Sequence, residues 1–151
     1  MGDDYVQDNN SNKNINLSDF DLKSLELLNI QKNMGLLAIY ADILSYISTL
    51  ESIDLIYARY DENAKNIPNP DIPILQSAYI SIFIRIIFTQ IGFTKYDMLL
   101  ERSNNGDYKY SLDPNRKINM ANLLGIVANS YSLSAIEEIY LREKDQPIFG
   151  I

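Results

Sequence analysis

The chain has 151 residues, with 13 basic and 20 acidic side chains and a formal net charge of −7. It contains no cysteine, histidine or tryptophan, which excludes disulfides, catalytic triads, thiol nucleophiles and Cys/His metal sites built from this chain. The acidic balance predicts no nucleic-acid partner, because proteins that bind nucleic acid cluster Lys and Arg. With 46% apolar residues, the length fits one domain with a hydrophobic core.

The N-terminal segment is predicted to be a flexible polar arm over residues 1–16. Its Asn-rich part buries too little apolar surface to offset the entropy of ordering it. The first residues also lack the basic and apolar regions of a secretory signal. We therefore expect a single domain over residues 17–151 in a cytoplasmic, bacterial protein.

The first helix is predicted to begin after Ser18, which can cap it together with Asp21. Apolar side chains then recur every three or four residues, at Leu22, Leu25, Leu36, Ile39, Ile43, Tyr46, Leu50, Ile53, Tyr57 and Tyr60. A 3.5-residue period predicts a stripe packed against sister helices. One continuous or kinked helix over 18–64 is favoured by the unbroken phase, but a turn at Asn33–Gly35 between helices of 19–32 and 36–64 stays open.

Prolines and turn residues divide the rest of the chain into two further helices. Pro68 and Pro70 end the first helix, and Asp71 with Pro73 starts a second over 72–102. Residues 80–86 alternate like a strand, but the proline-led start and the length favour helix. Asp113 and Pro114 then start a third over 114–144, with a turn or kink near Ser132. The predicted fold is an all-α antiparallel bundle of three principal helices, one or more of them kinked or split.

Residues 72–93 are long enough to cross a membrane. Gln76, Arg85 and Gln90 interrupt this segment, and an arginine near the middle of a span costs about 2.5 kcal/mol or more. The polar interruptions therefore predict a buried central helix and no membrane span.

No motif predicts a cofactor, a metal ion or a catalytic residue. The glycines form no phosphate-binding loop, and a calcium loop centred on Gly106 would place Leu112 where a glutamate is required. Arg85 is the single candidate for an anion or partner contact, because it lies among isoleucines. It must pair with a carboxylate, reach the edge of the bundle or face a ligand. Its candidate partners on the first helix are Asp42, Glu51 and Asp54.

Two apolar segments are candidate interfaces. A long first helix would overhang its shorter partners at its N-terminal third and expose Leu22, Leu25 and Leu28. The C-terminal tail carries Ile148, Phe149 and Ile151, which either fold back onto the core or dock a neighbour's groove.

The expected function is a non-enzymatic interaction or assembly protein that forms a homo-oligomer or docks another protein. The alternative is a small-molecule binding module with an apolar pocket between helices and Arg85 as its anion anchor. An enzyme that uses carboxylates, Tyr, Lys and Arg is chemically possible, but the sequence carries no signature for one.

Overall fold

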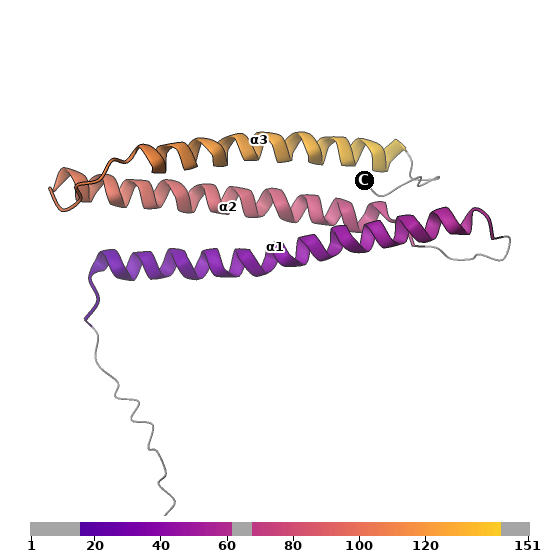
Figure 1. Ribbon diagram of the computed structural model, residues 1–151, viewed down its shortest axis with the longest axis horizontal. Coiled ribbons are helices and arrows are strands. Elements are labelled where there is room, and N and C mark those ends of the chain that lie inside the picture. Colours follow the sequence, from indigo (N-terminus) through magenta and orange to yellow (C-terminus); the bar gives the residue numbers. More distant parts are fainter. Residues whose placement is uncertain (1–15, 62–67, 143–151) are drawn as a thin grey trace, which may run out of the picture.

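The computed structural model describes residues 16–61 and 68–142, which form three long helices and, within these ranges, no strand (Figure 1). They are α1 (Asp19–Ala58), α2 (Asp71–Asn104) and α3 (Asp113–Arg142). The helices run antiparallel, with α2 between the other two. Both α1 and α3 pack on α2, and they make no contact with each other. The predicted all-α antiparallel fold is confirmed, in the form of an open layer.

The first helix is continuous, which answers the question that the sequence left open. Ser18 accepts a hydrogen bond from the backbone N–H of Asp21 at 3.2 Å and donates its hydroxyl to the carboxylate of Asp21 at 2.6 Å. These two bonds confirm the predicted N-cap. The helix then passes through Gly35 without a break, because helical hydrogen bonding needs no side chain there.

The second and third helices begin where the sequence predicts. Asn69 accepts a hydrogen bond from the backbone N–H of Asp71 at 2.9 Å, and α2 runs as a helix through residues 80–86. No turn interrupts α3 near Ser132, whose hydroxyl donates instead to the carbonyl of Ala128 at 3.2 Å. The expected turn is wrong, because residues 132–137 continue the same helix and begin no new one.

The apolar stripe of α1 does not pack against α2. Its side chains are between 43% and 88% exposed, and we call them the outer stripe: Leu22, Leu25, Leu36, Ile39, Ile43, Tyr46, Leu50, Ile53, Tyr57 and Tyr60. The side of α1 turned to α2 instead carries buried Leu27 and Leu44 together with a row of small residues, which we call the Ser/Ala row: Ala38, Ala41, Ser45, Ser48 and Ser52. The prediction that the stripe faces sister helices is wrong. The Ser/Ala row also repeats every 3.5 residues, and its small side chains let the two backbones approach.

The N-terminal turns of α1 do not overhang the layer. The guanidinium carbon of Arg102, near the end of α2, lies 4.5 Å from the ring centroid of Phe20. In Figure 1 it is the C-terminal end of α1 that extends past the start of α2. The expected overhang is therefore at the other end of the helix.

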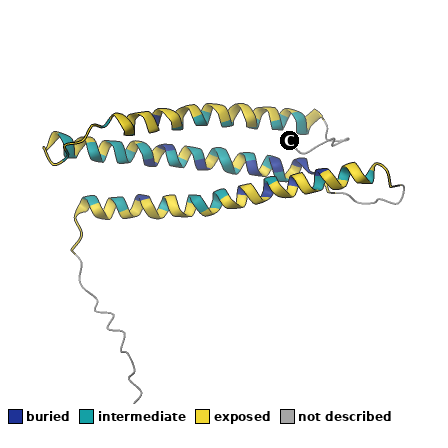
Figure 2. Cartoon of the chain, in the orientation of Figure 1, coloured by how far each residue is buried: buried dark blue, intermediate teal, exposed yellow. Residues whose placement is uncertain are grey.

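The interior of the layer is small and partly polar. Seven buried side chains are apolar: Leu27, Ala41, Leu44, Pro70, Ile74, Ile84 and Ile91. Six buried residues are polar: Ser48, Ser52, Asp71, Ser77, Thr89 and Asn119. Figure 2 shows exposed residues along the edges of α1 and α3 that face away from α2. The described part of the chain thus buries almost as many polar as apolar residues and leaves many large apolar side chains outside, unlike an ordinary bundle in water.

Candidate functional site

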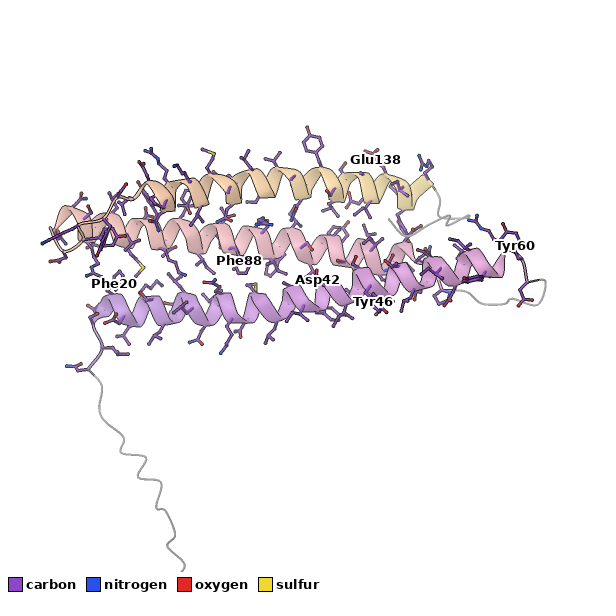
Figure 3. The ribbon with its side chains drawn as sticks, in the orientation of Figure 1. Phe20, Asp42, Tyr46, Tyr60, Phe88 and Glu138 are labelled. Carbon is purple, nitrogen blue, oxygen red and sulfur yellow. The ribbon has the colours of Figure 1, made fainter. Side chains whose placement is uncertain are left out.

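A groove follows α2 between α1 and α3, and we call it the central groove. It consists of two adjoining clefts, with volumes of about 380 Å³ and 360 Å³, and Phe88 of α2 lines both. Figure 3 labels Phe88 and, on the facing helix, Asp42. Because all three helices contribute side chains, this groove is where distant parts of the sequence meet.

Arg85 lies in the first cleft. Asp42 of α1, Ser81 and Phe88 of α2, and Asn129 of α3 line the same cleft. The guanidinium makes no ion pair with any carboxylate in residues 16–61 and 68–142. Of its three candidate partners, the structure brings Asp42 to the groove, without an ion pair.

Gly125 of α3 makes room for Arg85. A methyl group at Gly125 would lie 3.0 Å from the Nε atom of Arg85, inside normal contact distance. The guanidinium therefore lies against the bare backbone of α3, which fixes the side of the groove that it occupies.

The second cleft has amide side chains along its α3 wall. Asn115, Asn119 and Asn122 line it, and Asn119 is only 5% exposed. A methyl group at Gly92 would lie 2.5 Å from the Oδ1 atom of Asn119, so α3 approaches α2 closely here. Across the groove, Lys95 of α2 donates from Nζ to the Oε1 atom of Gln31 on α1 at 3.0 Å.

The groove supplies hydrogen-bonding groups and opposite charges, but they are spread along its length. Arg85 and Lys95 are ten residues apart on one helix, or about 15 Å at 1.5 Å per residue. One small anion cannot bridge that distance. In the described ranges no three Asp, Glu, His or Cys side chains gather as they would to hold a metal ion. The arrangement suits recognition of an extended polar surface, such as a helix, better than recognition of a small molecule.

The predicted interface residues do not form one patch. Leu22, Leu25 and Leu28 are 52%, 46% and 51% exposed. Leu28 lines a cleft beside Lys95 at the end of the groove, whereas the other two belong to the outer stripe. The tail residues Ile148, Phe149 and Ile151 lie outside the described residues.

Sequence reasoning missed the asparagine wall of the groove. Asn115, Asn119, Asn122 and Asn129 are spaced by four, three and seven residues, so they share one face of a helix. That periodicity is present in the sequence and could have identified this wall.

No protein-family model, curated protein or solved structure matches this chain.

Proposed function

We propose that this chain is a non-enzymatic assembly protein that associates with a second copy of itself through the central groove. The open layer supports this proposal, because α1 and α3 flank α2 without closing over it. In an ordinary bundle a further helix would fill that position. The groove therefore has the form of an incomplete bundle that another chain completes.

Charge complementarity favours a second copy of the chain as the partner. Asp42 and Arg85 line the same cleft, and neither has an ion-pair partner among the described residues. In a two-fold symmetric dimer, a contact from one copy to the other is repeated in reverse. Arg85 of each copy can then pair with Asp42 of the other, so both charges are satisfied twice.

The second candidate function is the small-molecule binding module. One observation favours it, because the guanidinium of Arg85 has no ion-pair partner in the described ranges and could hold an anion. The expected pocket was apolar, however, and the groove is open and lined with amides. If Arg85→Met raises stability and leaves every ligand-induced thermal shift intact, the arginine is not a binding group.

Exchanging the two charges between copies tests self-association. One tagged copy carries Arg85→Asp and a differently tagged copy carries Asp42→Arg. Each variant alone places like charges opposite each other, so co-purification of its two tagged forms should fall at least about tenfold. The mixed pair restores opposite charges between copies and should recover wild-type co-purification. A pairing within one chain could not be rescued by mixing.

Asp54→Arg is the matched control, because Asp54 lies on α1, is exposed and does not line the groove. This variant should co-purify with itself as the wild type does. Wild-type copies that remain monomers by light scattering would overturn the assembly proposal. A mixed pair that is no better than either variant would overturn the assignment of the groove.

A further inference from the structure

Exposed apolar side chains face outward from the layer in three directions. The outer stripe lies on α1, at one edge. On the opposite edge, α3 exposes Leu124, Val127, Tyr131 and Leu141. On the side of α2 that faces away from the groove, Tyr79, Phe83, Ile86 and Phe93 are each at least 40% exposed. A second copy seated in the groove would cover none of these three surfaces.

The middle of each helix is poor in charge. Residues 33–50 of α1 contain one charged side chain, Asp42, and residues 72–94 of α2 contain one, Arg85. Residues 118–136 of α3 contain none. At about 1.5 Å per residue these segments are about 27–35 Å long, close to the thickness of about 30 Å of a bilayer's hydrocarbon core. By length and composition, α1 and α2 each qualify as a candidate membrane span, whereas α3 does not.

Contacts between the helices place the three charge-poor segments side by side. Ser77 of α2 donates from Oγ to the carbonyl of Ala41 on α1 at 2.8 Å. On the other side of α2, Arg85 lies against Gly125 and Gly92 lies against Asn119. The α2 and α3 segments therefore lie level with each other. The α1 segment is level with the first part of the α2 segment, because Ala41 faces Ser77, and Glu26 of α1 lines a cleft with Ile87 of α2. We call the level that all three segments share the slab.

The contacts inside the slab are those that stabilise helices in lipid. Ala38, Ala41, Ser45 and Ser48 of α1 are small residues at the α1–α2 contact, and the hydroxyl of Ser77 donates across it to the carbonyl of Ala41 at 2.8 Å. Helix pairs in membranes use such small residues and hydrogen bonds because lipid offers no hydrophobic drive for association. The two charged residues of the slab, Asp42 and Arg85, both line the central groove. Ionisable groups within membranes face the interior of the protein in this way.

We propose that a lipid bilayer covers the parts of these outer apolar surfaces that lie within residues 33–50, 72–94 and 118–136, and that these three segments cross it. A continuous apolar solvent covers all three directions at once, whereas a protein partner covers one. Sequence reasoning expected no span because Arg85 interrupts the second segment, but the structure turns that side chain into the groove and away from this surface.

The distribution of basic residues orients the chain. The connection from α2 to α3 and its flanks, residues 95–117, carries Lys95, Arg102, Lys109, Arg116 and Lys117. The connection from α1 to α2, residues 51–71, carries Arg59 and Lys65. Since cytoplasmic loops carry the excess of Lys and Arg, the α2–α3 connection lies on the cytoplasmic side.

Membrane flotation of the full chain, expressed in bacterial cells, is the first test. The protein should float with the membranes in a sucrose gradient and stay with them after alkaline carbonate extraction. Protein that stays in the supernatant without detergent would overturn the proposal. If the chain sediments as an aggregate, it is reconstituted from detergent into vesicles of phosphatidylethanolamine and phosphatidylglycerol. Flotation then supports the proposal, and failure to float overturns it.

Single cysteines test the orientation, because the chain has none of its own. Ile39→Cys in the outer stripe should resist a water-soluble maleimide until detergent is added. Asn105→Cys should react only after the cells are opened, and Tyr60→Cys, at an 88% exposed position, should react in intact spheroplasts. Reaction of Ile39→Cys in opened cells without detergent would overturn the proposal.

The two proposals fail separately. A soluble oligomer would overturn the bilayer proposal and support self-association. A monomer embedded in the membrane would do the reverse.

Discussion

The two contacts of α2 differ in how they bring the backbones together. On the α1 side, the Ser/Ala row over residues 38–52 lets the backbones approach. On the α3 side, close approach occurs at two single glycines, Gly92 and Gly125, each with a polar side chain of the facing helix against it. The two contacts are similar in extent, but the first has small residues on several successive turns and the second at two separate positions.

This difference determines what each contact tolerates. A larger side chain anywhere in the Ser/Ala row would separate two long helices along their common length, since neighbouring turns cannot adjust independently. At Gly92 or Gly125 the facing atoms belong to side chains, Asn119 and Arg85, which can move locally. We therefore expect the largest losses of stability on the α1 side.

Ala41→Leu should have the largest effect. Ala41 is 2% exposed, and its carbonyl accepts the hydrogen bond from Ser77, so three added carbon atoms have no space. Overpacking of this kind costs about 3 kcal/mol. The helical circular dichroism signal during urea denaturation, in buffer or in a mild detergent, measures the loss.

Tyr40→Leu is the control, because Tyr40 is the adjacent residue and is 50% exposed. It should change the free energy of unfolding by less than about 0.5 kcal/mol. Equal losses in both variants would mean that the Ser/Ala row is not the contact surface of α1.

The elements of this fold could be predicted from the sequence, but the faces that they bury could not. Ser18, Asp71 and Asp113 mark helix starts through local chemistry, and all three helices begin within one residue of the predicted positions. Which side of α1 meets α2 depends on how closely two backbones can approach. That is a property of the pair of helices, and the periodicity of one helix does not contain it.

The candidate site was predictable to a similar extent. Arg85 stands out in the sequence as a charge among isoleucines, and Asp42 was one of its three candidate partners. Which of the three shares a cleft with Arg85 depends on the register between α1 and α2. The groove itself exists because α3 packs on α2 beside α1 without touching it, and no local pattern encodes that arrangement.

Gly92→Ala should lower the free energy of unfolding by less than Ala41→Leu does, whereas Gly35→Ala should raise it. Alanine in place of a helical glycine gains about 1 kcal/mol, and at Gly35 the new methyl group meets nothing within 4 Å. At Gly92 it lies 2.5 Å from the Oδ1 atom of the buried Asn119. The strain should outweigh the gain, with a net loss of about 1 kcal/mol. Thermal denaturation of both variants measures the difference in sign.

Shortening the facing side chain isolates the cause. Asn119→Ser in the Gly92→Ala background removes the group that clashes and should recover stability lost in the single variant. If the double variant loses the sum of the two single effects, the two residues do not interact as the structure describes.

Glu51→Gln should give the smallest change in stability, and this change depends on pH. Its Oε2 atom is buried without a hydrogen-bond partner in the described residues. Burial, and secondly the charge of Asp54, raise the pKa of the Glu51 carboxyl above its ordinary value.

Because of this raised pKa, the folded state binds the proton of Glu51 more tightly than the unfolded state does. This group's contribution to stability is fully present below the unfolded pKa and is lost as the pH rises through the folded pKa. Glu51→Gln should consequently be more stable than the wild type at neutral pH, with a difference that shrinks as the pH falls through the raised folded pKa and disappears below the unfolded pKa of about 4.5. Urea denaturation at pH 7 and pH 4 measures this, with Glu26→Gln as the control, because that exposed residue pairs with Lys23 and should gain nothing. A stability difference for Glu51→Gln that stays constant with pH would show that ionisation of this carboxyl does not oppose folding.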